Sequence, residues 1–141
     1  MAVKVATSNF EVSTRGENEI LDITAFVGEA VASSKLSSGI ATVFVVGSTA
    51  ALTTIEHEPG LVKDFPRMLA RVAPTDVAYE HEKRWHDGNG RSHVKASLVG
   101  PSLSVPFVDG ELTLGEWQQV ILAEFDTRPR KRKVVVQLIG E

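Results

Sequence analysis

The sequence predicts an α+β domain with a mostly antiparallel β-sheet core and two helices. Three observations support this fold class. Short runs of β-branched and other apolar residues, bounded by Gly or Asp-Gly, recur along the chain and are typical of strands. Only two segments space their apolar residues as a helix does. No repeat, low-complexity stretch or linker divides the 141 residues, so we expect residues 1–141 to form a single domain.

The first part of the chain is expected to supply a strand, a helix and a buried strand. Residues 3–12 alternate polar and apolar side chains, as a half-buried strand does. Asp22 can cap a helix, which the small polar residues and the Gly of residues 33–39 end. The apolar residues at helical spacing are Ile23, Phe26, Val27, Ala30 and Val31. Residues 40–47 form a β-branched run bounded by Gly, which indicates a buried strand.

A second helix is expected to begin near Pro59-Gly60. Proline is compatible with the first turn of a helix, so Pro66 is tolerable only near that turn. The apolar stripe of this helix comprises Leu61, Phe65, Leu69 and Val72.

The remainder of the chain has the pattern of strands. These segments are residues 92–100, 102–115, 117–126 and 133–140. Asp109-Gly110 is a strong two-residue signal for a hairpin within the second of them. The last two are expected to pair as long strands joined by the basic run of residues 128–133.

Three apolar runs predict an oligomer. Residues 40–46, 119–123 and 133–139 are apolar on nearly successive positions, so both faces of these strands need to be covered. Two helices are too few to cover them. We therefore expect a partner subunit to cover the remaining face.

Composition excludes several classes of protein. The chain is 43% apolar and 23% charged, as ordinary globular domains are. It has no cysteine, which excludes disulfides, a thiolate nucleophile and a cysteine-type metal site. No apolar run approaches the roughly 18 residues of a spanning helix, so no membrane role is expected. The N-terminus lacks the pattern of a signal peptide, and a cytoplasmic location is expected.

Charge is concentrated in one short segment. The net charge is −3, and residues 128–133 hold five basic residues and no acidic one, so the rest of the chain stands at −8. An acidic body with one basic run argues against nucleic-acid binding, since only Phe125 lies nearby to stack on bases. Arg128 and Arg130 can clamp a phosphate through planar bidentate contacts. The alternative is a solvated turn whose charges protect sheet edges.

Three of the four histidines cluster around two turn signals. His81, His86 and His93 flank Asp87-Gly88 and Asn89-Gly90. Glycine lets a backbone approach a ligand closely, and imidazole is a common metal ligand and acid–base group. The spacing matches no recognised zinc motif, so histidines that cap turns remain the alternative. We expect His81 and His93 to share one pocket, with nitrogens no more than about 8 Å apart if they bind one metal.

Further candidate residues follow the predicted buried strand. Glu56 offers a carboxylate as a metal ligand or base, whereas His57 is expected to point away from it. Ser48 and Thr49 offer hydroxyls suited to phosphate or carboxylate oxygens, although a tight turn under a sheet explains them equally well. No Gly-Lys-Ser/Thr follows them, so no nucleotide cofactor is expected.

Several segments, in their order and spacing, resemble the YjbQ-like family, small proteins described as secondary thiamine-phosphate synthases. The resemblance covers nearly the whole chain. The matching segments are residues 48–56, 59–65, 79–81, 88–102, 108–120, 124–132 and 138–141.

The resemblance implies an α+β homotrimer with sites near subunit boundaries. It also implies a weak transferase activity, in which hydroxymethylpyrimidine diphosphate is joined to a thiazole phosphate and diphosphate is released. Glu56, His81 and His93 take the positions of the family's characteristic polar residues, and a divalent metal, zinc or magnesium, is the implied cofactor. The alternative function is a metal- or anion-binding trimer without relevant turnover.

The chain departs from the family pattern at two positions. Many relatives have histidines where this chain has Gly47 and Arg91, so a metal site copied from them would lose a ligand. His86 is the candidate replacement, beside His81 and His93. Additional positive charge for a phosphorylated ligand would then come from arginines. The candidate ligand-binding residues are Ser48, Thr49, Asn89, Arg91, Arg128 and Arg130.

Overall fold

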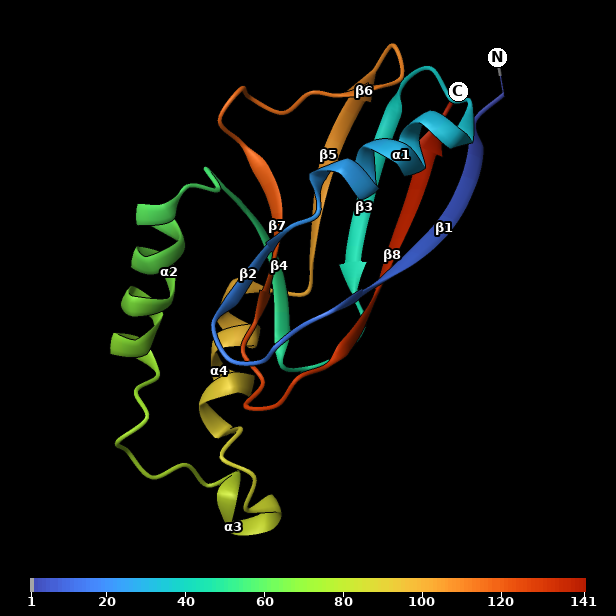
Figure 1. Cartoon of the computed structure of the whole chain (residues 1–141). Helices are drawn as coiled ribbons and strands as arrows, with labels where there is room; N and C mark the ends of the chain where they lie inside the picture. The colour runs from blue at the N-terminus through green and yellow to red at the C-terminus, as the bar shows by residue number, and fades with distance from the viewer. Residues whose placement is uncertain (1) are drawn as a thin grey trace.

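The computed structural model describes residues 2–141, and in it the strands form two antiparallel sheets (Figure 1). The strands are β1 (Lys4–Ser13), β2 (Glu19–Asp22), β3 (Gly39–Val45), β4 (Ala50–Ile55), β5 (Ser102–Val108), β6 (Glu111–Leu112), β7 (Gln119–Glu124) and β8 (Lys131–Gly140). Sheet A has the order β1-β8-β3-β5-β6, and sheet B has the order β2-β7-β4. The predicted α+β class with antiparallel sheets is therefore confirmed.

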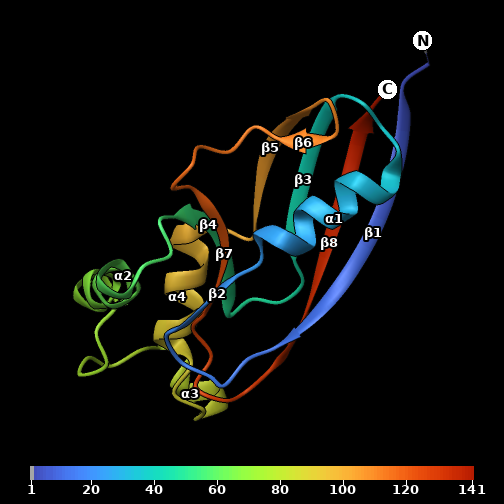
Figure 2. The ribbon, with the colours of Figure 1, turned by 45° about the horizontal axis from the view of Figure 1, so that its top comes forward.

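The described residues 2–141 contain four helices, not the two that the sequence predicts. They are α1 (Thr24–Ser34), α2 (Pro59–Val72), α3 (Glu82–Trp85) and α4 (Gly90–Val99). Figure 2 shows α1 lying across sheet A, while α2 and α4 lie on the far side of sheet B. No helix in this part of the chain is long and apolar enough to span a membrane.

The main core lies between the inner face of sheet A, α1 and one face of sheet B. Sheet A contributes alternate residues of its strands, such as Val43 and Val136, and α1 contributes Val27 and Val31. All four side chains are fully buried. Burying apolar side chains of this size stabilises the fold by roughly 1.5–3 kcal/mol each, which makes this layer the main source of stability.

The opposite face of sheet B packs on the helices. Ala51, Ile121 and Ala123 of the sheet meet Ala96 of α4, and Phe65 of α2 packs against them. Because β7 has a core on each side, its run of successive apolar residues is buried on both faces. The prediction that both faces are covered holds for this strand within one subunit.

The outer face of sheet A is uncovered within the subunit. Ala41, Val43 and Val45 of β3 are fully buried, but the intervening Ile40 and Phe44 are 53% and 42% exposed. The predicted buried strand at residues 40–47 is thus buried on one face only. The alternation follows from the pleat, which sends neighbouring side chains to opposite faces.

The strand predicted for residues 92–100 is wrong, because this segment forms α4. The buried face of the helix carries Ser92, Lys95 and Ala96, with Val99 partly buried. Their spacing of three and four residues is helical. Two of these residues are polar, so the helical period is absent from the apolar pattern. The Lys95 side chain is almost fully buried, with its ammonium 5.9 Å from the Phe125 ring centroid.

The predicted pairing of the last two long strands is also wrong. β7 pairs with β2 and β4 in sheet B, and β8 pairs with β1 and β3 in sheet A. Residues 125–130 therefore cross between sheets. Apolar patterning identifies a strand and its buried face but not its neighbour, which depends on the tertiary fold.

Most of the other local predictions hold. β1, α1, α2 and β8 lie close to their predicted ranges, and Phe107 and Val108 pair with Leu112 and Glu111 around the expected hairpin turn. Asp109 and Gly110 both have positive φ there, at 53° and 77°. Pro66 lies inside α2, beyond its first turn, and Val72 is 63% exposed although it belongs to the predicted apolar stripe. The short elements β2, β4 and α3 are not predicted.

Candidate functional site

His81 and His93 meet at one corner of the molecule. His81 immediately precedes α3, and His93 lies in the first turn of α4, where its N–H donates to the Asn89 carbonyl. Their ring centroids are 4.5 Å apart, with the planes tilted by 52°. The intervening chain reverses through His86 and Gly88, whose φ values are 53° and 72°. The turn signals therefore bring the two imidazoles together, as expected.

Two carboxylates lie beside His81. Nε2 of His81 is 3.4 Å from Oδ1 of Asp87. The nearest donor atoms of His81, Glu82 and Asp87 all lie within 4.8 Å of one another. Among residues 2–141, Nε2 of His81 is buried and has no hydrogen bond. We call His81, Glu82, Asp87 and His93 the histidine group.

The donor set of the histidine group fits a divalent metal. Imidazole nitrogen and carboxylate oxygen bind zinc at about 2.0–2.2 Å, so two ligands of one ion lie at most about 4.4 Å apart. The donor atoms of His81, Glu82 and Asp87, all within 4.8 Å of one another, are spaced close to this limit. Magnesium prefers oxygen ligands and keeps several waters, so this nitrogen-containing set favours zinc.

The surroundings hold both carboxylates in place. Glu82 accepts a hydrogen bond from the N–H of Gly90, at 2.6 Å, and Asp87 accepts one from the N–H of Asn89, at 3.0 Å. The hydrogen bond from Asn89 lowers the pKa of Asp87, an effect that the nearby His81 reinforces. Asp87 is therefore ionised at neutral pH, as a metal ligand must be.

His86 and Glu56 do not join this group within the subunit. His86 is exposed at the far end of α3 and lines a hollow of about 480 Å³ with Tyr79 and Arg91. Glu56 follows the end of β4, whereas Ala50 at its start shares a cavity with His93. Six residues of strand span about 20 Å, too far for Glu56 to reach His93 in the same chain. His57 contacts β2, with Nε2 3.0 Å from the Ile20 carbonyl oxygen.

Ser48 lies near His93 and is exposed. Both residues line a small cavity of about 160 Å³, together with Gly47, Ala50, Ala96, Ser97 and Pro101. Its volume suits a small group rather than a whole substrate, since ligand pockets usually span about 300–1,000 Å³.

Most of the predicted anion-binding side chains have internal partners. Thr49 donates to Asp126 at 2.9 Å and accepts from Arg132 at 2.6 Å. The Arg91 guanidinium binds both carboxylate oxygens of Glu17 at 2.8 Å and also donates to the Gly88 carbonyl. Hydrogen bonding to Arg91 lowers the pKa of Glu17 despite partial burial. These groups hold the chain in place before any ligand binds.

Asn89 and Arg130 both bond to Asp126, a residue that the sequence does not single out. Asn89 donates to Asp126 at 3.3 Å and accepts from Ser92 and from the N–H of Thr127. Arg130 donates to Asp126 at 3.0 Å. Arg128 is exposed and binds Asp126 only through its backbone N–H in the described residues. Burial would raise the pKa of Asp126, but its hydrogen bonds outweigh burial and hold the pKa at about 2.

A buried ion pair adjoins these residues. Glu124 is fully buried, and Arg132 binds both of its carboxylate oxygens, at 2.8 and 2.5 Å. We call Thr49, Glu124, Asp126, Arg130 and Arg132 the polar network. It ties β4, β7 and β8 together at the end of the sheets where α4 begins. The sequence signal for the polar network is the pair of acidic residues Glu124 and Asp126, which directly follows an apolar run.

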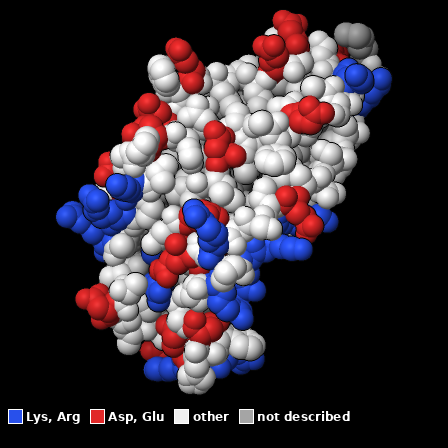
Figure 3. All heavy atoms as spheres, in the orientation of Figure 1, with Lys and Arg blue, Asp and Glu red and all other residues white. Residues whose placement is uncertain are grey.

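The polar network also explains Gly47. A Cβ atom at this position would lie 2.6 Å from a terminal nitrogen of Arg132, and the φ of +131° disfavours any other residue. Figure 3 shows acidic and basic side chains intermixed over the lower part of this face, where α3 and the start of α4 lie. In the upper part, over sheet A and α1, the charged side chains are mostly acidic and lie scattered among uncharged ones.

Comparison with known proteins supports the family resemblance. A family model described as UPF0047 protein YjbQ-like matches residues 8–141. A UPF0047 protein of Methanothermobacter thermautotrophicus is 36% identical over 139 residues, covering 99% of this chain and 95% of that protein. The UPF0047 protein YugU of Bacillus subtilis is 34% identical over 132 residues, covering 92% and 96%.

Solved structures share the fold over almost the full length. The crystal structure of a YbjQ-like protein of unknown function from Sulfolobus solfataricus superposes with a TM-score of 0.92 and 31% identity, covering 99% of this chain and all of that one. An uncharacterised protein from Clostridium acetobutylicum has a TM-score of 0.80 and 36% identity, covering 92% and 98%. This chain therefore belongs to the UPF0047 YjbQ-like family.

Proposed function

We propose that the chain binds a divalent metal, preferably zinc, through His81, Glu82 and Asp87, and uses this site to bind a phosphorylated small molecule. The observation that supports this proposal is the buried Nε2 of His81, which has no hydrogen bond among residues 2–141 and lies 3.4 Å from Asp87. Burying a polar atom without a partner costs free energy, so a ligand that satisfies the nitrogen stabilises the site.

The proposed reaction is the one that the family resemblance implies. Hydroxymethylpyrimidine diphosphate and a thiazole phosphate are joined, and diphosphate leaves. His81, Glu82 and Asp87 would hold a divalent ion, which would supply positive charge to the leaving diphosphate. His93, 4.5 Å from His81 between ring centroids, orients the phosphate groups, and the exposed Arg128 adds positive charge.

Metal binding and turnover require separate tests. Metal analysis of protein purified without a histidine tag should find about one zinc per chain, and His81→Ala should lose it. His57→Ala is the matched control, because His57 lies outside the histidine group. Incubation with both precursors should then yield thiamine phosphate, and His93→Ala should abolish the product. Zinc retained by His81→Ala would contradict the site.

We also propose that the protein is a homotrimer. Ile40, Val5 and Ile139 form a row across sheet A and are 53%, 61% and 51% exposed. A second subunit on this face would bury them. An intersubunit site would also allow Glu56 of one chain to approach the histidine group of another. Sedimentation at micromolar concentration should give three times the chain mass of 15.3 kDa, and a monomer mass would contradict the trimer.

A second function, metal or anion binding without turnover, has its own support. The Arg91 and Arg130 guanidinium groups are already bonded to Glu17 and Asp126. Few positive groups therefore remain to stabilise a leaving diphosphate. Zinc binding with no thiamine phosphate above the level of the His93→Ala variant would favour this function over the transferase.

A further inference from the structure

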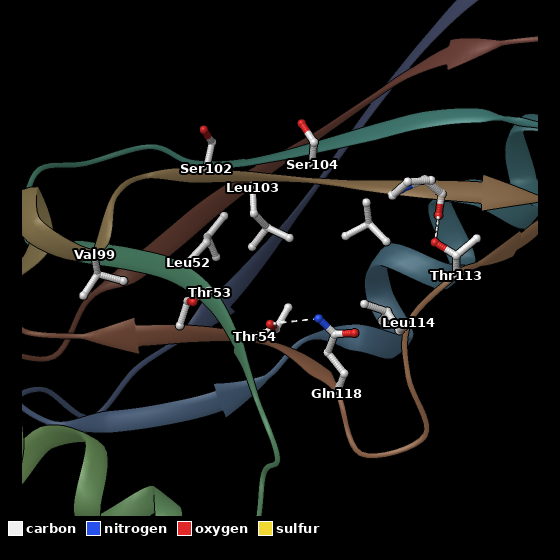
Figure 4. Close-up of a pocket in the computed structure, with 12 residues that line it drawn as sticks. Leu52, Thr53, Thr54, Val99, Ser102, Leu103, Ser104, Thr113, Leu114 and Gln118 are labelled. Atoms are coloured by element: carbon white, nitrogen blue, oxygen red, sulfur yellow. Dashed lines mark hydrogen bonds between the residues drawn. The ribbon is translucent and has the colours of Figure 1, made fainter.

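Two strand edges open onto one groove, at a distance from the histidine group. In sheet B, β4 pairs with β7 on one side only. In sheet A, β5 pairs with β3 on one side, and β6 covers only Phe107 and Val108 on the other. The two open edges are joined at one end by a hydrogen bond from the N–H of Leu52 to the Gly100 carbonyl. Beyond it they diverge, as Figure 4 shows.

The alternation of hydrogen-bonding direction along each strand identifies the main-chain groups that face the groove. Residues of an antiparallel pair alternate between bonding to the partner strand and pointing away from it. The Val45 N–H donates to the Pro101 carbonyl, so Leu103 and Val105 also bond to β3, while Ser102 and Ser104 point away. Pro106 follows the same alternation, because its carbonyl accepts from the Thr113 N–H on the side away from β3.

The same reasoning applies to β4. The bond from Leu52 to Gly100 shows that Leu52 points away from β7, so Thr54 does too. Within residues 2–141, the N–H and C=O groups of Ser102, Ser104 and Thr54 have no main-chain partner on this side. Unpaired strand edges of this kind bind other extended chains readily.

The side chains of the groove are uncharged. Its volume is about 320 Å³, and none of the twelve residues that line it is Asp, Glu, Lys, Arg or His. Leu52 and Leu103 form an apolar floor, and Gln118 bonds to Thr54 at 3.2 Å along one side (Figure 4). A charged ligand would lose hydration here without gaining an opposite charge.

We propose that this groove binds an extended, uncharged peptide segment of about three to five residues, which adds a strand between β4 and β5. Its main chain bonds to Ser102 and Ser104 on one side and to Thr54 on the other. Its alternate apolar side chains pack on the floor. This site shares no residue with the histidine group, so it does not depend on the function proposed above.

A blocked neutral peptide, acetyl-Thr-Val-Thr-Val-amide, provides the test. Titration into isotopically labelled protein should shift the amide resonances of Ser102, Ser104 and Thr54 saturably. Ser104→Pro removes one groove-facing N–H and should weaken binding at least tenfold. Proline fits this edge, since Pro106 already occupies the next equivalent position. Thr42→Ala is the control and should bind within twofold of wild type, because Thr42 pairs with Ser104 across β3 but does not line the groove.

The peptide itself supplies a second test that does not depend on a variant's folding. A peptide N-methylated at alternate amides keeps its side chains but loses main-chain donors, and it should not bind wild-type protein. Equal binding of both peptides, or no shift at the three amides, would overturn the proposal. Protection of these three amides from hydrogen exchange without peptide would also overturn the proposal if it increased with protein concentration. A second copy of the chain would then occupy the groove.

Discussion

The polar network and the histidine group are neighbouring clusters of polar residues with opposite hydrogen-bonding states. In the network, Glu124 and Asp126 are buried, and each is bonded to an arginine and to further donors. In the histidine group, the Nε2 atom of His81 is buried and no hydrogen bond reaches it from residues 2–141. The network is complete without a ligand, so its role is to hold the fold, whereas the histidine group is incomplete.

The largest expected effect comes from breaking the buried ion pair of the network. Glu124→Ala leaves Arg132 buried without its carboxylate partner, which should lower the free energy of unfolding by about 3–5 kcal/mol. Denaturant unfolding measures this loss. Lys133→Ala, one residue from Arg132 but exposed, is the control and should change stability by no more than about 0.5 kcal/mol. A loss under about 1 kcal/mol for Glu124→Ala would remove the contrast between the two clusters.

The histidine group should respond to zinc instead. At a free zinc concentration 100 times the dissociation constant, binding should raise the free energy of unfolding by about 2.7 kcal/mol. His81→Ala should lose this gain, while its stability without metal should fall little, because no hydrogen bond of the Nε2 atom is removed. Thermal unfolding with and without zinc measures both quantities. A metal-free His81→Ala that is strongly destabilised would show that His81 supports the fold.

Acid should weaken the network at Asp126. The pKa of Asp126 is about 2 in the folded chain against an ordinary 3.8, so its contribution is present above pH 4 and is lost as the pH falls towards 2. This shift corresponds to roughly 2 kcal/mol. Denaturant unfolding between pH 5 and pH 2 should show the loss in wild type and a smaller slope in Asp126→Asn. Identical slopes would exclude Asp126 as the source.

The smallest effect is expected at the ion pair between Arg91 and Glu17, outside the network. Arg91→Lys keeps the charge but loses the planar contact with both oxygens of Glu17, which should cost about 1 kcal/mol because the pair is partly exposed. The pKa of Glu17 should rise towards its ordinary value, as a titration followed by NMR would show. Unchanged stability and an unchanged pKa would mean that the pair contributes nothing.

The fold was predictable where local patterns act alone. The spacing of Val27 and Val31 predicts α1, and Asp109-Gly110 predicts the hairpin, since both signals depend on a few adjacent residues. α4 was missed because Ser92 and Lys95 occupy its buried face, where an apolar pattern is the only sequence signal. The separation of β7 from β8 depends on which sheet each joins, and this information is not local.

The candidate site was predictable to a similar degree. The turns between His81 and His93 indicate that the two rings can meet, and the rings do meet. The sequence indicates only a turn role for Asp87, although its side chain lies beside His81. The polar network draws on residues from Thr49 to Arg132, so no spacing along the chain reveals it.

The position of β8 at the centre of sheet A has a consequence for the order of folding. β8 lies between β1 and β3, yet it follows every other described strand in the chain. During synthesis, β1 and β3 leave the ribosome long before the strand that joins them. β3 can pair with β5 before then, but β1 cannot join sheet A until residues 131–140 emerge, so one edge of β1 and one of β3 stay unpaired in the nascent chain and open to other chains.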